Sequence, residues 1–238
     1  MDRAPQHKSQ TARIGDLLRE LIVGARYAPG QKLRIDDLCS ELEGSSSAVR
    51  EALSRLTAEG LVVALPQKGF VVAPISRHDL IDLTEVRVHI EQRCLEQSIR
   101  AGDIEWEGRI LSIRHRFLAL SGAYKKAGSP EARRWHQLHQ QFHDELTSGC
   151  ANRWWRRLRR QLYMQSERYR RLSGPFADYD RDVDGEHRTL ADAVLARDVK
   201  QATALITNHL RTTTDILLAS SMEFSDDETP SSQAATAG

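Results

Sequence analysis

The sequence predicts a mainly α-helical protein of two domains, and two observations carry that prediction. Residues 10–73 hold three short stretches of helical apolar spacing, followed by two β-rich runs around a turn. From residue 76 to about 220 only helical periodicity continues, with breaks at Gly, Pro and Asn. We therefore expect an N-terminal winged helix-turn-helix over 10–75, with three helices and a β-hairpin. An all-helical bundle of six or seven helices should follow over 76–220.

The first domain begins with a helix expected over residues 10–25, because Ile14, Leu18 and Ile22 recur at helical spacing. The pair Pro29-Gly30 then breaks the chain. A short second helix ends at Gly44, and a third follows Ser45 to Ser47, whose hydroxyls can cap it. The runs 61–65 and 70–73 are expected to pair as a hairpin around the turn 66–69.

The second domain opens with a capping box, Ser76 to Asp79, and its last helix follows a second cap, Asp198-x-x-Gln201. Apolar side chains share helical stripes in between, and we expect these stripes to face the core: Leu83, Val86, Ile90 and Cys94; Trp135, Leu138, Phe142 and Leu146; Ala202, Leu205, Ile206, His209 and Leu210. The tail, 221–238, is rich in Ser, Asp, Thr and Ala and is expected to be disordered.

Composition excludes some classes of protein. The 238 residues carry 34 Lys and Arg against 33 Asp and Glu, a net charge of +1, so DNA affinity has to come from how charge is arranged. No apolar run reaches the roughly 20 residues that span a bilayer, and the polar N-terminus is no secretory signal. Three scattered cysteines are typical of reduced thiols, so we expect a cytoplasmic protein without membrane contact.

The third helix has the polarity that a recognition helix needs. Its start, Ser45, Ser46 and Ser47, offers hydroxyl and N–H donors to phosphate, and Arg50 lies one turn further on, within reach of a base edge. Lys68 and Gly69 at the wing tip suit close approach to a minor groove. Spacing alone leaves open a small helical domain that contacts proteins instead of DNA.

Three segments in this region look like the N-terminal signature of the GntR family: Pro29 to Arg34, Val49 to Val62, and Gly69-Phe70-x-Val72. The resemblance implies a winged helix that binds palindromic operators as a homodimer. It implies that Arg34, Ser45, Ser47, Arg50, Lys68 and Gly69 face DNA. Ser46 stands where the family usually has an arginine, so one charge-assisted contact is missing at that position.

A pair of histidines marks the candidate ligand site of the second domain. His139 and His143 are four residues apart, so they lie on one face of a helix beside its buried stripe. Neutral imidazoles in this arrangement can share Zn²⁺ or Ni²⁺. The same spacing also occurs in pairs that are solvated or sit at the edge of a core. His136, one turn earlier, is a competing ligand.

The second domain is similar to the FCD-type ligand-binding domain of FadR-like GntR regulators, over about residues 78–218. The similarity rests on Leu83-x-Glu85-x-Arg87-x-x-x-Glu91, Phe142-His143-x-x-Leu146, Glu186-His187 and His209-Leu210. It implies a divalent metal, zinc more than nickel, held by His143, His187 and His209, with a small carboxylate effector nearby. His139 occupies the family's aspartate position, which removes a negative charge and favours an anionic ligand. Arg87 matches a carboxylate-binding arginine; alternatively it is a buried partner of Glu91 or Asp82.

Two other interpretations carry less weight. A zinc hydrolase helix needs His-Glu-x-x-His, and Gln140 cannot act as the base. The basic run from Trp154 to Arg160 is expected to be the solvated face of a core helix instead of a second DNA contact. We predict a non-enzymatic DNA-binding regulator, a repressor at the nucleoid. The alternative is a metal-dependent hydrolase or a metal-binding helical protein that does not act on DNA.

Overall fold

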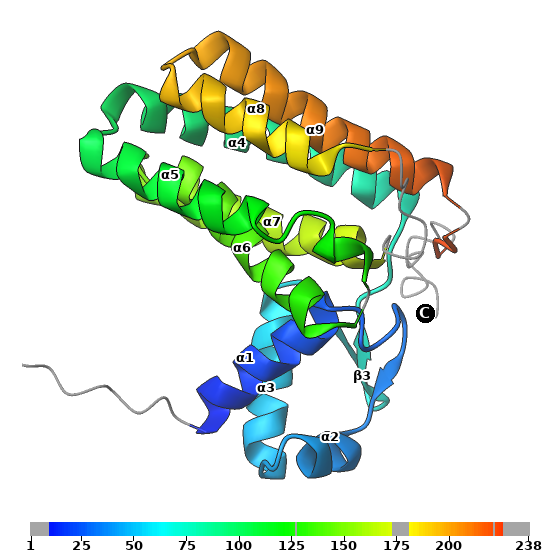
Figure 1. The fold of residues 1–238 in the computed structure, drawn as a ribbon. Helices are drawn as coiled ribbons and strands as arrows, with labels where there is room; N and C mark the ends of the chain where they lie inside the picture. The colour runs from blue at the N-terminus through cyan, green and yellow to red at the C-terminus, as the bar shows by residue number, and fades with distance from the viewer. Residues whose placement is uncertain (1–9, 127, 173–180, 221, 226–238) are drawn as a thin grey trace, which may run out of the picture. The chain divides into compact units, whose positions relative to one another are not determined.

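The computed structural model describes residues 10–126, 128–172, 181–220 and 222–225, so the expected disorder of 221–238 falls, apart from 222–225, outside the described residues. The chain divides into two compact units. The first comprises residues 1–78, 167–172 and 223–238, and the second comprises 79–166 and 173–222. Figure 1 shows a mainly helical chain with one small sheet, as the sequence predicts.

The first unit is a winged helix built from α1 (Gln10–Val23), α2 (Ile35–Glu41) and α3 (Ser46–Ala58). Helices α1 and α3 pack on each other, and their facing apolar side chains are fully buried: Ile14, Leu18, Val49, Leu53 and Leu56. An ion pair between Arg19 and Glu59 closes the far end of the packed pair, with N–O distances of 2.6 and 2.8 Å. Burial of this stripe is what orients α3.

The sheet has one strand more than the sequence predicts. Besides the hairpin of β2 (Val62–Leu65) and β3 (Gly69–Val72), a short strand β1 (Lys32–Leu33) pairs antiparallel with β3, in the order β1-β3-β2. Gly30 permits this pairing, since its positive φ of 75° turns the chain before β1 and its N–H donates to Val72 O. Two residues are too few for a periodic signal, so the pattern of alternation missed β1.

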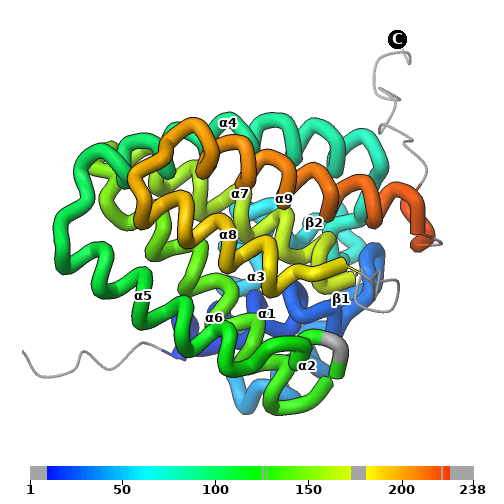
Figure 2. The backbone as a smooth tube through the Cα atoms, turned by 45° about the horizontal axis from the view of Figure 1, so that its top comes forward, coloured from blue at the N-terminus to red at the C-terminus, as the bar shows by residue number. Residues whose placement is uncertain are grey.

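The second unit is built from six described α-helices and a short 3-10 helix, η1 (Ala123–Lys125), although residues 77–78 and 167–172 of these helices belong to the first unit. The α-helices are α4 (Arg77–Ala101), α5 (Ile104–Leu118), α6 (Pro130–Leu146), α7 (Arg153–Leu172), α8 (Val183–Leu195) and α9 (Val199–Ala219). Helix α5 lies beside α6, and α8 beside α9, in both Figure 1 and Figure 2. Several of these helices begin after a residue whose side-chain oxygen accepts a backbone N–H of the first turn. One is the expected cap, in which Asp198 accepts the Gln201 N–H.

The bundle core confirms the stripe on α6 and corrects one residue of the stripe on α4. Trp135 and Phe142 pack against Phe117 of α5, with ring centroids 5.2 and 5.7 Å apart. Val86 of α4, by contrast, is 51% exposed. The buried face of α4 is centred on Arg87, Val88 and Glu91, which turns Val86 outward. Because this buried face includes the polar residues Arg87 and Glu91, the spacing of apolar residues did not predict it.

Candidate metal centre and nucleic-acid interface

Four imidazoles from three helices converge inside the second unit. His139 and His143 come from α6, His187 from α8 and His209 from α9. One ligand atom of each lies within 4.8 Å of the others, and the four side chains are buried. The i,i+4 spacing put the first pair on one face of α6. The packing of α8 and α9 brings in the other two.

The ring nitrogens are spaced as metal ligands would be. His143 Nε2 lies 3.2 Å from His139 Nε2 and 3.2 Å from His187 Nε2. A tetrahedral site with bonds of about 2.0–2.1 Å has edges of about 3.3 Å. These two edges therefore fit a tetrahedral zinc ion.

The outer nitrogens of three of the rings contact groups that orient them. His187 Nδ1 donates to Val183 O at 2.6 Å, one helical turn earlier. His139 Nδ1 lies 3.3 Å from the Tyr163 hydroxyl, and His209 Nδ1 lies 2.7 Å from Glu186 Oε2. The Val183 carbonyl and the Glu186 carboxylate only accept, so they place the proton of His187 and of His209 on Nδ1 and leave Nε2 to face a metal. The Tyr163 hydroxyl can donate or accept, and it orients the His139 ring.

Burial keeps these imidazoles in the form that binds metal. It lowers the pKa of His143 and of His187 well below the usual value, and nearby His209 lowers both further. Burial also lowers the pKa of His209, although the hydrogen bond to Glu186 opposes the shift. Neutral imidazoles present their lone pairs near neutral pH, which a divalent cation requires.

The sequence interpretation missed Glu186 and Arg181. Burial alone would raise the pKa of Glu186, but hydrogen bonds from Arg181 and His209 lower it to about 2, so the carboxylate is charged. Sequence reasoning treated the charge on the ion as wholly uncompensated, yet this carboxylate contacts one of the four rings directly. Its only signal was the Glu-His pair at 186–187.

Aromatic rings enclose one side of the cluster. Trp135 stacks on His139 with centroids 4.9 Å apart and planes at 17°. Phe117 lies 4.9 Å from the His187 ring. His136 contacts the edge of Trp135 and is outside the four-histidine group, so the geometry favours His139 over this competing ligand.

The guanidinium of Arg87 lies near the histidines and acts on them. Arg87 is buried, donates to Ser166 Oγ at 2.6 Å, and has its guanidinium 3.6 Å from Glu91. It also lowers the pKa of His143, after burial and the neighbouring histidines. Arg87 thus has Glu91 as a buried acidic partner, as one of the two sequence interpretations expects. Its charge also acts on His143 and His209, so it can act on a ligand bound beside them.

Arg156, Arg157 and Arg160 of α7 are exposed, as the sequence predicts, but Arg159 is buried. Its side chain is 5% exposed and donates to Glu91 at 2.8 Å, to Asp144 at 2.6 Å and to His143 O at 2.8 Å. It belongs to the core because Glu91 is buried and needs a cation.

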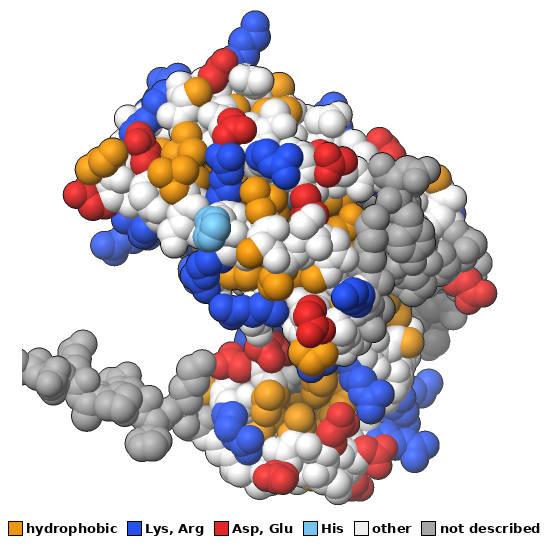
Figure 3. Space-filling model, viewed as in Figure 1, with side chains coloured by type: hydrophobic (Ala, Val, Ile, Leu, Met, Phe, Trp, Pro, Cys, Tyr) orange, Lys and Arg blue, Asp and Glu red, His pale blue; other side chains and the backbone are white. Residues whose placement is uncertain are grey.

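The candidate DNA-contacting residues of the first unit are all exposed: Arg34, Ser45, Ser46, Ser47, Arg50, Lys68 and Gly69. Ser45 caps α3 by accepting the Ala48 N–H at 3.3 Å, and its hydroxyl contacts that of Ser47 at 3.2 Å. The cap occupies Ser45, so Ser46 and Ser47 remain the hydroxyls best placed for phosphate. On the face in Figure 3, Lys and Arg alternate with Asp and Glu, in keeping with the near-zero net charge.

The wing tip combines Lys68 with a glycine in the left-handed region. Gly69 has φ of +91°, a conformation that strains other residues, and the Lys68 N–H closes the turn on Leu65 O at 3.0 Å.

Among the described residues, no helix is both long and apolar enough to cross a membrane.

Two family models match this chain. Residues 10–72 match "Bacterial regulatory proteins, gntR family", and residues 82–212 match "FCD domain". The second match alone covers more than half of the chain. Together they pair a DNA-binding helix-turn-helix with a domain that implies a small-molecule effector.

Curated relatives are regulators of transcription. The chain is 40% identical over 200 residues to the uncharacterized HTH-type transcriptional regulator BphR of Paraburkholderia xenovorans, covering 84% of this chain and 82% of the relative. It is 32% identical over 204 residues to the HTH-type transcriptional repressor GlaR of Escherichia coli, covering 84% and 92%. Neither relative is named as an enzyme.

Solved structures share the fold. Escherichia coli McbR/YncC superposes with a TM-score of 0.75 at 16% identity, covering 89% of this chain and 98% of that one. A putative GntR regulator from Rhodococcus sp. RHA1 gives 0.68 at 21% identity, covering 89% and 98%. The winged helix, the FCD match and these relatives agree, and the chain therefore belongs to the GntR family of bacterial regulatory proteins, as a non-enzymatic, DNA-binding regulator of transcription.

Proposed function

We propose that this regulator is a homodimeric repressor in the cytoplasm, whose operator binding responds to a small carboxylate-bearing effector at a divalent metal, zinc more than nickel. The observation that carries the proposal is the convergence of four buried imidazoles with two Nε2–Nε2 distances of 3.2 Å. When bound, the metal would supply positive charge that attracts an anion. Because four imidazoles fill a tetrahedral shell, the anion would lie beside the ion and would not replace a ligand. One relative is named a repressor, which supports this direction of regulation.

Zinc fits this ligand set for two reasons. All four donors are nitrogens, and zinc has no preference for octahedral over tetrahedral coordination, whereas nickel favours higher coordination numbers or a square plane. The two observed edges are close to the tetrahedral value of about 3.3 Å.

The anionic class of the effector follows from charge. Four neutral imidazoles leave the ion's charge to be balanced, and the acids near the cluster are already paired with arginines: buried Glu91 with Arg159, and half-buried Glu186 with Arg181. Arg87 adds a further cation beside His143 and His209. A carboxylate fits a site of this sign, and the forked guanidinium of Arg87 suits it as a second contact.

The dimer is proposed because one recognition helix reads too few base pairs, whereas two half-sites supply enough. Exposed apolar side chains on the neighbouring helices α4 and α7, Val86, Trp154 and Leu158, offer a surface for a second copy. Light scattering at micromolar concentration should give twice 26.9 kDa. A monomer, both free and bound to operator, would contradict this part of the proposal.

The metal proposal is tested by elemental analysis of protein purified without a His-tag, using wild type, His143→Ala and His136→Ala. Wild type and His136→Ala should carry close to one zinc per chain, and His143→Ala should carry none while still binding DNA. His136 is the matched control, because it lies on the same helix outside the cluster. Metal-free wild type, with a melting temperature that a chelator leaves unchanged, would refute the metal and leave the histidines as polar lining.

A further inference from the structure

The Glu186 carboxylate hydrogen-bonds one of the four imidazoles directly. Its Oε2 lies 2.7 Å from His209 Nδ1. The other two anchored rings contact neutral groups, the Val183 carbonyl and the Tyr163 hydroxyl. A carboxylate strengthens such a bond, and it makes the imidazole a better electron donor to a metal on the opposite nitrogen.

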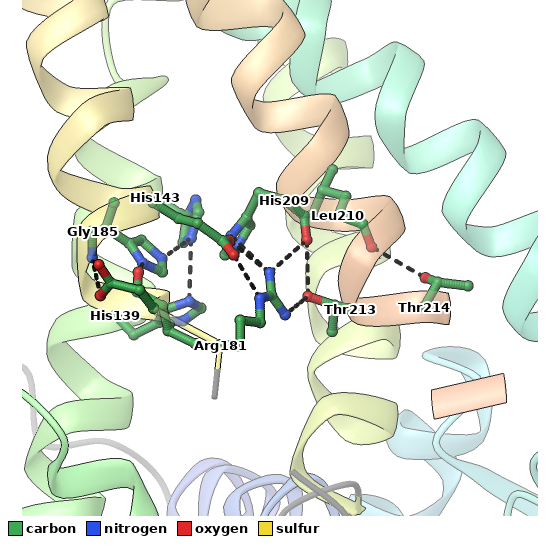
Figure 4. Close-up of polar contacts among 12 residues, drawn as sticks. His139, His143, Arg181, Gly185, His209, Leu210, Thr213 and Thr214 are labelled. Atoms are coloured by element: carbon green, nitrogen blue, oxygen red, sulfur yellow. Dashed lines mark hydrogen bonds and ion pairs between the residues drawn. The ribbon is translucent and has the colours of Figure 1, made fainter. Parts of the chain in front are cut away.

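Arg181 holds this carboxylate in place. Its Nε and Nη2 donate to the two oxygens of Glu186, both at 2.7 Å, as a bidentate pair. The remaining donors reach α9, where Nη1 contacts Thr213 Oγ1 at 2.9 Å and Nη2 contacts His209 O at 3.1 Å. Figure 4 shows the guanidinium directed at His209 and Thr213. Glu186 on α8 is thereby set in register with the histidine on α9.

The surroundings of His209 Nδ1 contain two opposed influences. Glu186 Oε2, at 2.7 Å, accepts a hydrogen bond from Nδ1–H and favours the tautomer whose Nε2 is free for metal. Arg181 Nη2, at 3.3 Å from the same nitrogen, is only a donor and favours the opposite tautomer, with the proton on Nε2. The contact with the carboxylate is the shorter of the two, so it prevails. Removing the carboxylate leaves the arginine to select the tautomer that blocks metal.

We infer that Glu186, clamped by Arg181, is a positioning residue that sets the metal affinity of the four-histidine site by holding His209 with Nε2 turned inward. The inference rests on the proposed metal site and adds to it an acidic group beyond the ligands. His139 stands at the family's aspartate position, so the ligand set has no carboxylate. Glu186 supplies one that contacts the ligand His209 and not the ion.

The test compares zinc dissociation constants of full-length wild type, Glu186→Gln, Glu186→Ala and Glu107→Gln, measured by competition with a chromogenic chelator. Glu186→Gln keeps the shape and loses the charge, and its dissociation constant should rise roughly 10–100-fold. Glu186→Ala should lose at least as much. Glu107 is the matched control, since it also pairs with an arginine, Arg197, at similar exposure but away from the histidines.

A second measurement separates positioning from general loosening of the fold. In the metal-free protein, imidazole nitrogen NMR should find the His209 proton on Nδ1 in wild type and mainly on Nε2 in Glu186→Ala. Replacing Arg181 by Met in that variant removes the competing donor, and should recover part of the zinc affinity. A merely structural carboxylate would predict the reverse, because a second deletion would loosen the site further.

The outcomes are distinguishable. Wild type that binds no zinc would overturn the metal site itself. Wild type that binds zinc, with Glu186→Gln and Glu107→Gln both within twofold of it, would overturn the role of Glu186 alone. If Glu186→Gln and Glu107→Gln lose zinc affinity equally, the cause is a general loosening of the fold and not the contact with His209. That result would also count against the inference. Glu186→Gln decides the matter if circular dichroism shows that the alanine variant has lost helix.

Discussion

Replacing Arg159 by Met should destabilise the helical unit severely. The guanidinium makes three hydrogen bonds, to Glu91 at 2.8 Å, to Asp144 at 2.6 Å and to the carbonyl of His143 at 2.8 Å. That carbonyl belongs to the last turn of α6, where backbone acceptors have no partner within the helix. Methionine fills much of the same volume and offers no donor.

The magnitude follows from what the substitution leaves behind. Glu91 is buried, and the nearest other cation, Arg87, is 3.6 Å away, beyond hydrogen-bond length. Breaking a buried ion pair by removing one partner costs roughly 3–5 kcal/mol, because a buried charge is left uncompensated. For a chain of this size that is about 6–20 °C in melting temperature. Removing Glu91 as well, as Leu, should recover only part of the loss, because buried Arg87 then loses its contact with Glu91.

The measurement is thermal and urea unfolding followed by circular dichroism, with Arg100→Met as control. Arg100 also pairs with a glutamate on α4, Glu96 at 2.7 Å, but its side chain is 70% exposed. Such a pair contributes about 0.3–0.5 kcal/mol. The reasoning fails if Arg159→Met costs no more than the control. It fails equally if Arg159→Met/Glu91→Leu is less stable than Arg159→Met alone.

Three further outcomes can be measured directly. Since burial lowers the pKa of His143, His187 and His209 in the folded state, the unfolded chain takes up their protons first. The metal-free protein should therefore keep its stability above about pH 7 and lose it below about 6.5, by at most about 1.4 kcal/mol per pH unit for each histidine; a flat urea midpoint from pH 7 to 5.5 would contradict this. Arg50→Ala should weaken operator binding by ~1–3 kcal/mol and relax base preference, which a panel of operator variants can detect. Lys68→Ala should weaken all duplexes alike and reduce the salt slope by about one, and a sequence-dependent effect would place Lys68 on a base.

Most of the fold was predictable because it follows from the spacing of apolar residues within each segment. Helices α1, α3 and α6 each carry an apolar stripe that the packing buries, and caps such as Ser45 and Asp198 lie where a hydroxyl or carboxylate precedes the stripe. Strand β1 was not predictable in this way. It is two residues long and exists because Gly30 turns it onto β3, a contact between segments that are about 40 residues apart.

Half of the candidate site was accessible to the same reasoning. The spacing of His139 and His143 put two rings on one face of a helix, but it could not exclude a solvated pair. His187 entered only through the family resemblance. His209 lies on the apolar stripe that the sequence predicts for the last helix, but only the resemblance assigned it to the metal. The structure brings all four together, with ligand atoms inside 4.8 Å.

The charged groups around the site escaped prediction for a physical reason. Arg159, Glu91, Arg181 and Glu186 are strongly polar residues, and a sequence pattern assigns such residues to the surface, because burying any one of them alone is costly. Arg159 and Glu91 are buried here because they pair with each other from different helices, α7 and α4, and Arg181 and Glu186 are partly buried where both contact His209 of α9. A residue whose burial depends on a distant partner leaves no periodic trace, so the ligands of such a site can be read from spacing and resemblance. The groups that orient the ligands emerge only once the helices are packed.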